Sequence, residues 1–259
     1  MENNKKIGIV GIGNMGFAIF NSIKEKHQIT IYDPYKKNEY PNLPFTNEIK
    51  DLEESSEIIL LCVKPDQIKE VLSQFTKPLK FISIAAGITV SYLKEKAPVG
   101  SQFIRLMPNL PLLVNEGAMD YIGDKELYPD LISIFGNLGI LLEVPKESLM
   151  DSVTGLAGSG PAFVFSFIHS LAEGGVKNGL KFEDSLRLAI QTVKGSAEYL
   201  ESELNKSNLI HPALLRNRVT SPGGTTIFGL EKLEEGKFHS VVMEAVNAAV
   251  NRSRELGKK

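Results

Sequence analysis

A glycine-rich turn near the start of the chain most strongly limits what the chain can fold into. Gly11, Gly13 and Gly16 directly follow the apolar run 7–10, and apolar residues at helical spacing come after them. A buried strand, a turn of this spacing and a helix form the first unit of a parallel sheet that binds a dinucleotide. Gly11 permits the sharp bend, Gly13 lets the backbone approach a pyrophosphate, and Gly16 lets the helix pack on the strand. The alternative is a tight turn that binds nothing.

Strands and helices alternate through the first half of the chain. The expected strands are 7–10, 29–32, 57–63, 81–84, 103–106 and 139–142. The expected helices are 14–26, 65–75 and 90–96. This alternation is typical of a doubly wound parallel sheet, so we expect a Rossmann-like α/β domain over residues 1–146.

The second half of the chain carries helical patterns and no convincing strand. The segment 147–180 is largely helical, with an interruption at 155–161, and a second helix covers 186–200. A further amphipathic stripe consists of Phe238, Val241, Val242, Ala245, Val246, Ala249 and Val250. Their spacing is that of one face of a helix. We therefore expect an all-α domain over residues 147–259.

The amino-acid composition limits which binding partners and which cell compartment we expect. The net charge of −2 over 259 residues gives no reason to expect nucleic acid or a membrane as a partner. The single cysteine, Cys62, cannot form an internal disulfide or a zinc cluster, so we expect no metal site. The polar start of the chain does not have the pattern of a signal peptide. We expect a cytoplasmic protein.

Asp33 and the helix start complete the dinucleotide pattern. The helix is expected to begin at Asn14 and Met15, where its N–H groups face the pyrophosphate. Asp33 ends the second strand, at the spacing from Gly11 that a ribose-binding acid has. Its carboxylate would repel a 2′-phosphate, which favours NADH. Lys36 and Lys37 follow it and leave NADPH open, because they could pair with that phosphate; their alternative is a solvated turn.

Two more segments stand at carboxyl ends of expected strands, where open α/β sheets bind ligands. The small residues at 85–87 leave room for a flat nicotinamide ring, and Lys64 either is catalytic or contacts the cofactor. The expected cofactor-binding residues here are Val63, Lys64, Pro65, Ala85, Ala86 and Gly87.

A second glycine turn lies in the helical half. Ser221, Pro222, Gly223 and Gly224 precede Thr225 and Thr226, which open a helix. The free N–H groups of a helix start bind a carboxylate well, and two glycines let a ligand approach the backbone. Ser221 or the threonines can cap this helix. The alternative is an ordinary capping turn without a ligand.

One helix of this half is apolar almost all round. The segment 162–172 carries large apolar residues on every side, and such a helix has to be enclosed. A second subunit can enclose it, so we expect a homo-oligomer. The alternative is that other helices of the same chain suffice.

Together these motifs resemble the pyrroline-5-carboxylate reductases. The likeness covers nearly the whole chain and rests on the segments 11–16, 63–65, 105–109 (Arg-Leu-Met-Pro-Asn), 158–162 (Gly-Ser-Gly-Pro-Ala) and 215–226. The last segment ends in Val-Thr-Ser-Pro-Gly-Gly-Thr-Thr, the most specific signature of the family.

The resemblance implies both an architecture and a reaction. A Rossmann-like domain would precede a helical domain that dimerises, often into rings of dimers. NAD(P)H would deliver hydride to the C=N carbon of 1-pyrroline-5-carboxylate and give L-proline. A cyclic imine can be protonated before or during this transfer, so the protein needs no strong general acid.

The resemblance also implies roles for single residues. The N–H groups around Gly224, Thr225 and Thr226 would hold the substrate carboxylate, and the Thr226 hydroxyl would bond the ring nitrogen, either as a catalytic or as a binding group. The substrate site would also include Ser221, Gly223, Met107, Pro108 and Asn109, the last three beside the nicotinamide. The chain departs from the family at Asp33, where NADPH-preferring members carry small polar or basic residues, and at Asn217, where Asp is common.

Other classes of protein could have the same two-domain arrangement. β-Hydroxyacid dehydrogenases share it but need a catalytic lysine in the long helix, and residues 147–176 contain none. A reductase of another cyclic imine stays open, because sequence does not show pocket size. A non-catalytic nucleotide sensor would need no substrate clamp. The four histidines are interpreted as surface or packing residues.

Overall fold

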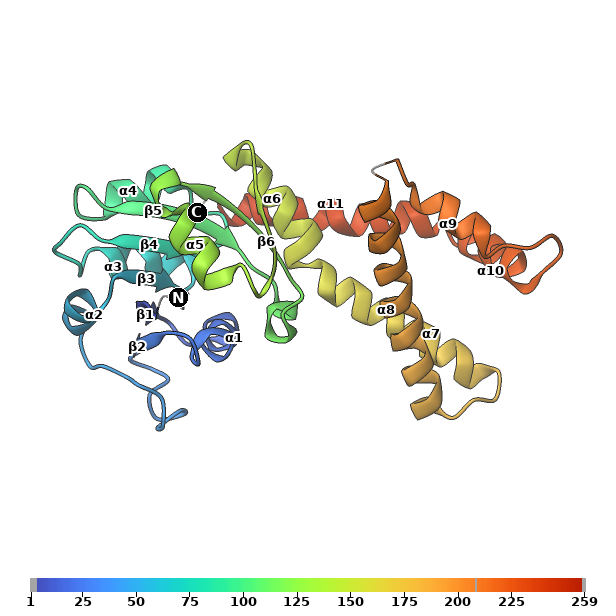
Figure 1. Ribbon diagram of the computed structural model, residues 1–259, viewed down its shortest axis with the longest axis horizontal. Coiled ribbons are helices and arrows are strands. Elements are labelled where there is room, and N and C mark those ends of the chain that lie inside the picture. The colour runs from blue at the N-terminus through green and yellow to red at the C-terminus, as the bar shows by residue number, and fades with distance from the viewer. Residues whose placement is uncertain (1–3, 208, 258–259) are drawn as a thin grey trace. The chain divides into compact units, whose positions relative to one another are not determined.

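The computed structural model describes residues 4–207 and 209–257 (Figure 1). The chain forms two compact units, Met1–Pro161 with Val246–Lys259, and Ala162–Ala245. Each unit is described by itself. The two domains expected from the sequence, 1–146 and 147–259, have other bounds and stay a prediction.

A seven-stranded sheet organises the first unit. The strands are β1 (Lys6–Val10), β2 (Gln28–Tyr32), β3 (Ile58–Leu61), β4 (Lys80–Ser83), β5 (Gln102–Met107), β6 (Gly117–Gly123) and β7 (Gly139–Glu143). Their order is β2-β1-β3-β4-β5-β6-β7, and every neighbouring pair is parallel except β5 with β6. The expected Rossmann-like sheet is confirmed, and the six expected strands are all present.

Helices cover both faces of this sheet. They are α1 (Asn14–Ile23), α2 (Ile49–Ser55), α3 (Ile68–Leu72), α4 (Val90–Lys96) and α5 (Tyr128–Phe135). Leu60 of β3 packs in one core cluster with residues of α1 and α5. Its neighbours Ile59 and Leu61 pack in the other cluster, with residues of α2, α3 and α4. Strand residues alternate between the two faces, so both faces are buried and the strands read as continuous apolar runs.

Several elements differ from the sequence-based expectation. Helix α1 ends at Ile23, and the helix expected over 65–75 is a 3₁₀ turn (Pro65–Gln67) followed by α3. The elements α2, β6 and α5 were not expected. Strand β6 reads Gly-Ala-Met-Asp-Tyr-Ile-Gly, and its mixture of glycine, acid and apolar residues hides it from a search for apolar runs.

Between the sheet and the helical half the chain stays helical. A 3₁₀ turn (Glu147–Leu149), α6 (Met150–Val153) and a π-helical turn (Thr154–Gly158) lead into α7 (Gly160–Lys177). The interruption expected at 155–161 is therefore a π-helical turn and not a break. Gly155 in this turn meets the last helix so closely that a Cβ atom there would lie 2.4 Å from Val250 Cγ2.

The second unit consists of helices, and no strand occurs among its described residues. It contains most of α7, then α8 (Phe182–Lys206), α9 (Pro212–Arg218), α10 (Thr225–Glu235) and the first part of α11 (Phe238–Leu256). Helices α7 and α8 pack closely, because the Ser185 hydroxyl on α8 donates to the Ala172 carbonyl oxygen on α7 at 2.7 Å. A Cβ atom at Gly175 would lie 2.0 Å from the same hydroxyl oxygen.

Large apolar side chains remain exposed on the second unit. Phe165 on α7 is 63% exposed, Phe228 on α10 is 64% exposed, and Ala172 is the buried residue of α7. By length and composition alone, the helical run Glu147–Lys177 could cross a membrane, a test that the core helix of a soluble protein also passes. Within this unit the other helices do not enclose the apolar segment 162–172, which leaves an apolar surface to be covered.

Candidate active site

Close packing holds the first glycine turn in place. Gly11 has a φ of +94°, and its N–H donates to the Tyr32 carbonyl oxygen at 2.9 Å. A Cβ atom at Gly16 would lie 2.2 Å from the carbonyl oxygen of Gly11, whereas one at Gly13 would meet no atom within 4 Å. Helix α1 begins at Asn14, with Gly13 as its N-cap and no side-chain capping bond. The first N–H groups of α1 are therefore open to an anion, as a pyrophosphate cradle requires.

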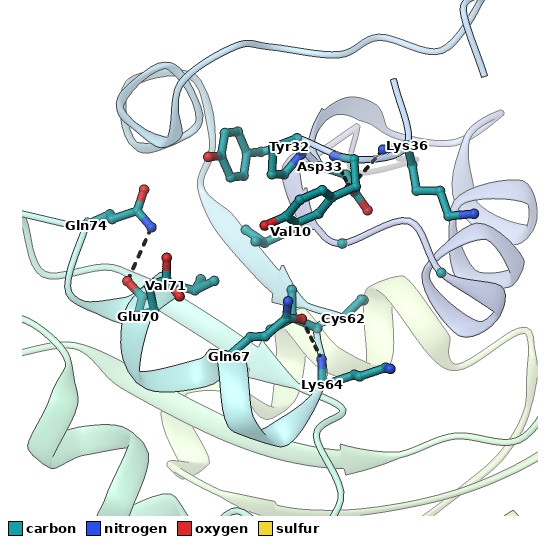
Figure 2. Close-up of a pocket in the computed structure, with 15 residues that line it drawn as sticks. Val10, Tyr32, Asp33, Lys36, Cys62, Lys64, Gln67, Glu70, Val71 and Gln74 are labelled. Atoms are coloured by element: carbon teal, nitrogen blue, oxygen red, sulfur yellow. Dashed lines mark hydrogen bonds between the residues drawn. The ribbon is translucent and has the colours of Figure 1, made fainter. Parts of the chain in front are cut away.

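Asp33 ties this turn to the end of β2. Its Oδ2 accepts a hydrogen bond from the Ile12 N–H at 2.9 Å. Its Oδ1 accepts from the N–H groups of Tyr35 at 3.0 Å and Lys36 at 3.1 Å (Figure 2). The carboxylate therefore shapes the glycine turn as well as facing the cavity beside it. The sequence pattern suggested the ribose role and did not suggest this backbone role.

A cavity of about 300 Å³ opens beside the turn and brings together residues from several segments (Figure 2). Of the residues expected to bind the cofactor, Gly11, Gly13, Asp33, Val63 and Lys64 line it. Asn14, Met15, Gly16, Pro65, Ala85, Ala86 and Gly87 are not among its lining residues. Sequence reasoning missed the lining residues Val10, Tyr32, Pro34, Tyr35, Cys62, Gln67, Glu70, Val71 and Gln74.

The cationic side chains at this cavity differ in what they contact. Lys36 forms an ion pair with Glu39, and this bond raises the pKa of Lys36. Lys37 donates to Asn47 Oδ1 at 2.7 Å. Among the described residues no ion pair holds the ammonium group of Lys64, whose backbone N–H donates to Gln67 Oε1 at 3.4 Å. Lys64 is therefore the lysine best able to meet an anionic ligand here.

Cys62 lines the cavity, and its thiol is a weak nucleophile. Burial raises the pKa of its thiol to about 12, so the thiol is protonated at neutral pH. A Cβ atom at Gly16 would lie 3.1 Å from Cys62 Cβ, so the side chain fills the space between turn and sheet.

The segment 107–109 begins at the last residue of β5, and Asn109 is the best anchored part of it. Asn109 is 6% exposed, its Nδ2 donates to the Ala157 carbonyl oxygen at 3.0 Å, and its Oδ1 accepts from the Ala118 N–H at 2.9 Å. Its amide therefore fastens this loop to the π-helical turn and to β6. A Cβ atom at Gly158 would lie 3.8 Å from Met107 Cε, which brings Met107 to the same turn.

The second glycine turn lies in the second unit, at the start of α10. Gly223 has a φ of +67°, and the Gly224 N–H donates to the Ser221 carbonyl oxygen at 3.1 Å. The N-cap of α10 is Gly224 and has no side-chain capping bond, so the expectation that Ser221 or a threonine caps this helix is wrong. The Ser221 hydroxyl occupies the space beside Gly224, because a Cβ atom at Gly224 would lie 2.3 Å from Ser221 Oγ. The N–H groups of the first turn of α10, which include that of Thr226, stay open to a carboxylate.

The residues before this turn are held on α8. The Arg218 guanidinium at the end of α9 donates to Tyr199 Oη at 2.9 Å and pairs with Glu203 Oε2 at 2.8 Å. The Thr220 hydroxyl donates to the Arg216 carbonyl oxygen at 2.8 Å. Sequence reasoning singled out Asn217 in this stretch and missed Arg218.

No three His, Cys, Asp or Glu side chains among residues 4–207 and 209–257 are grouped in a way that could hold a metal ion. Two of the histidines make exposed contacts with acids on the surface, His169 with Glu173 and His239 with Glu234.

Family models match both parts of the chain. Residues 147–256 match a model described as pyrroline-5-carboxylate reductase dimerisation, and residues 6–87 match one described as NADP oxidoreductase, coenzyme F420-dependent. The pyrroline-5-carboxylate reductase of Methanosarcina acetivorans is 38% identical over 99% of this chain and 99% of its own length. That of Synechocystis is 40% identical over 98% and 99%. The chain belongs to the pyrroline-5-carboxylate reductase family.

Solved structures of the family have the same fold. The pyrroline carboxylate reductase of Plasmodium falciparum, with NADP bound, is 36% identical, with a TM-score of 0.86 over 99% of both chains. The 1-pyrroline-5-carboxylate reductase of Streptococcus pyogenes is 30% identical, with a TM-score of 0.87 over 98% of this chain and 99% of that one. The family resemblance seen in the sequence is confirmed.

Proposed function

We propose that the protein reduces the C=N bond of 1-pyrroline-5-carboxylate with NAD(P)H and gives L-proline, the last step of proline biosynthesis. The observation that carries the proposal is the pair of uncapped helix starts within a chain of this family. One stands beside a cavity in the sheet unit, and the other follows Pro222, Gly223 and Gly224 in the helical unit. Each is suited to one of the two anionic ligands of the reaction.

The residues around the first turn fit a nicotinamide dinucleotide. A Cβ atom at Gly13 would meet nothing within 4 Å, so the backbone there is open to a pyrophosphate. Asp33 faces the adjoining cavity, where a ribose would lie, and the Lys64 ammonium would neutralise phosphate charge. When bound, the reduced cofactor supplies the hydride. We place the nicotinamide at the loop Ala85–Gly87, with Pro65 and Val63 nearer the adenosine half.

The residues of the second turn bind and orient the imine. The N–H groups of Gly224, Thr225 and Thr226 hold the substrate carboxylate, and the Thr226 hydroxyl bonds the ring nitrogen. Met107, Pro108 and the backbone of Asn109 line the substrate on the nicotinamide side. The protonated imine is a strong electrophile, so the protein contributes chiefly by positioning. This assignment demands no histidine or free carboxylate as a general acid.

For the cofactor we propose a preference for NADH, with NADPH usable. The Asp33 carboxylate faces the cavity and would repel a 2′-phosphate, and Lys36 and Lys37 are already bonded to Glu39 and Asn47. A 2′-phosphate would have to compete for these lysines. The NADP in the relative from P. falciparum is a reason to measure both cofactors.

For the assembly we propose a homodimer formed through the helical half, which further contacts could extend to a ring of dimers. The exposed apolar residues of α7 and α10 and the dimerisation family model over residues 147–256 support it. A dimer interface would also account for the apolar character of the run Glu147–Lys177 without a membrane. Residues 1–146 would then bind the cofactor, and 147–259 the substrate and the second copy, in a cytoplasmic enzyme.

The experiment that tests the reaction follows the oxidation of NADH, and separately of NADPH, with racemic 1-pyrroline-5-carboxylate. Turnover that yields L-proline supports the proposal, and the two values of kcat/KM give the cofactor preference. No turnover with either cofactor, in protein shown to be folded, would reject it. If the protein reduced a larger cyclic imine in preference to 1-pyrroline-5-carboxylate, it would instead be a related imine reductase.

A further inference from the structure

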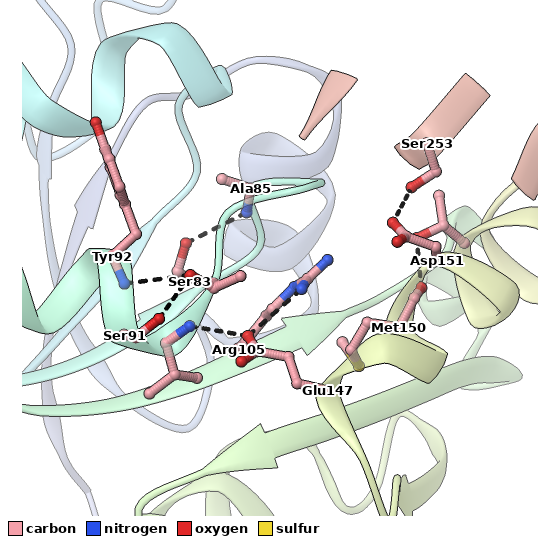
Figure 3. Close-up of polar contacts among 12 residues, drawn as sticks. Ser83, Ala85, Ser91, Tyr92, Arg105, Glu147, Met150, Asp151 and Ser253 are labelled. Atoms are coloured by element: carbon pink, nitrogen blue, oxygen red, sulfur yellow. Dashed lines mark hydrogen bonds and ion pairs between the residues drawn. The ribbon is translucent and has the colours of Figure 1, made fainter. Parts of the chain in front are cut away.

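The loop between β4 and α4 has its ends fixed by local contacts (Figure 3). The Ser83 hydroxyl oxygen accepts a hydrogen bond from the Ala85 N–H at 3.3 Å. Thr89 Oγ1 accepts from the Tyr92 N–H at 3.2 Å and caps α4. These bonds shape the loop that we assign to the nicotinamide, but they do not hold it against the rest of the unit.

A carboxylate from a distant segment supplies that attachment. Glu147 Oε1 accepts a hydrogen bond from the N–H of Val90, the first residue of α4, at 2.8 Å. The same oxygen lies 3.4 Å from Arg105 Nη1 on β5, and Figure 3 shows the two side chains together. The Arg105 side chain is 6% exposed. One oxygen of Glu147 therefore joins the end of the loop, the neighbouring strand and the start of the long helical run.

The last turn of α11 meets the same loop from another side. Gly87 has a φ of +76°, and a Cβ atom there would lie 2.6 Å from the Cα of Gly257. The Ser253 hydroxyl of α11 donates to Asp151 Oδ1 on α6 at 2.7 Å. Backbone packs directly on backbone here, so a shift of the loop at Gly87 would have to displace α11 as well.

We infer that Glu147 is a positioning residue for the cofactor loop. It does not line the cavity beside the glycine turn, and its direct hydrogen bond to the α4 end of the loop is to the backbone of Val90. The buried Arg105 needs a negative partner, and its ion pair with Glu147 Oε1 holds the Glu147 carboxylate in one orientation. The inference rests on the proposed function, because it takes the loop Ala85–Gly87 as the nicotinamide site.

Two variants test the attachment in different ways. Val90→Pro deletes the donor N–H and leaves the Arg105–Glu147 pair intact, and proline is favoured at the first position of a helix. Glu147→Gln removes the charge from the acceptor. Glu126→Gln is the matched control, since Glu126 is an exposed acid of the same unit whose side chain has no hydrogen bond or ion pair with the residues that the structure describes. Binding of NADH is titrated by its fluorescence, KM and kcat are measured with the imine, and thermal unfolding is recorded for each variant.

We expect Kd and KM for NADH to rise about tenfold in Val90→Pro and in Glu147→Gln, the change that one lost charge-assisted hydrogen bond produces. The KM for the imine should stay within about twofold in both, because the carboxylate clamp is untouched. Glu126→Gln should bind NADH as the parent does.

The inference is overturned if both variants are folded and bind NADH within about twofold of the parent, since one hydrogen bond is worth more than that. A lower melting temperature with unchanged Kd would show a structural role only, and would also overturn it. If Glu147→Gln does not fold, Val90→Pro decides alone. If the parent protein binds NADH but does not reduce the imine, the proposed function is rejected. The NADH-binding data of the variants then still test the positioning role of Glu147. A parent that binds neither cofactor overturns both.

Discussion

The two glycine turns perform the same task for a helix but are held in place in opposite ways. Both α1 and α10 begin after a glycine N-cap that has no side-chain bond. At the first turn, Cβ atoms at Gly11 and Gly16 would come within 2.9 and 2.2 Å of backbone oxygens. At the second, a Cβ atom at Gly223 would meet nothing within 4 Å. The first turn is set by packing against the sheet, and the second by its own backbone conformation and a few local bonds.

This difference shows which contacts make each ligand site rigid. The cofactor turn is fixed before any ligand arrives, because Cys62, Val63 and Asp33 surround it. The turn at Ser221–Gly224 is exposed, and within its unit it is held by the Gly224 bond to Ser221 and by the Arg218 contacts with α8. Substitutions should therefore damage the first turn through stability and the second through binding.

The largest effect should come from Gly16→Val. The added side chain would press on the backbone of Gly11, and overpacking of this kind costs about 3 kcal/mol of unfolding free energy. Gly13→Ala is the matched variant: we expect its stability to stay within about 0.5 kcal/mol of the parent, with binding of NADH lost. Urea unfolding and NADH titration measure the two effects. Equal losses of stability in both variants would contradict the role of packing at the first turn.

At the second turn, Thr226→Ala should lower kcat/KM for the imine by at least about tenfold, because a bond to the charged ring nitrogen is lost. NADH binding and the melting temperature should not change. Thr226→Ser keeps the hydroxyl and should recover most of the activity. Turnover of Thr226→Ala equal to that of the parent would show that the hydroxyl neither binds nor assists the imine.

Asp33→Asn should change the choice of cofactor. Removing the negative charge should raise the ratio of kcat/KM for NADPH to that for NADH by about tenfold, because the repulsion of a 2′-phosphate is relieved. The asparagine Nδ2 cannot accept the bonds that the carboxylate now receives, so a small loss of stability should accompany the change. If the ratio of the two kcat/KM values did not change, residues other than Asp33 would determine the cofactor preference, and Lys36→Ala would be the next variant to measure.

The smallest effect should come from Gly223→Ala. Its methyl group meets no atom, so only the left-handed backbone conformation opposes it, at a cost of about 1 kcal/mol. Gly229→Ala within α10 is the control and should be neutral or stabilising, since alanine is the better helix former. A loss of several kcal/mol in Gly223→Ala would show that the second turn is packed as tightly as the first.

Elements with strong local signals could be predicted from the sequence. Helix α4 spans the expected residues 90–96, and α10 begins at Thr225 after the two glycines. Strand β6 was missed because no apolar run marks it, although it alternates between buried and half-buried residues like other strands. The sequence predicts an interruption at 155–161 but not that it is a π-helical turn at Thr154–Gly158, because glycines that permit close packing look the same as glycines that end a helix.

In the candidate site, the sequence could predict which residues take part but not which groups they form hydrogen bonds with. The pattern identified Asp33 and Asn109, yet their bonds to Ile12, Ala157 and Ala118 join segments that only the folded chain brings together. Glu147 carried no sequence signal at all, because its partner Val90 contributes a backbone N–H, which every residue but proline possesses.

The position of Cys62 has a practical consequence for following this molecule in solution. It is the single cysteine of the chain, and burial raises the pKa of its thiol, so little of the reactive thiolate is present at neutral pH. A thiol reagent would therefore modify the native protein slowly. Because Cys62 lines the cofactor cavity, a bound dinucleotide should slow this modification further, and the rate of labelling would report whether the cavity is occupied.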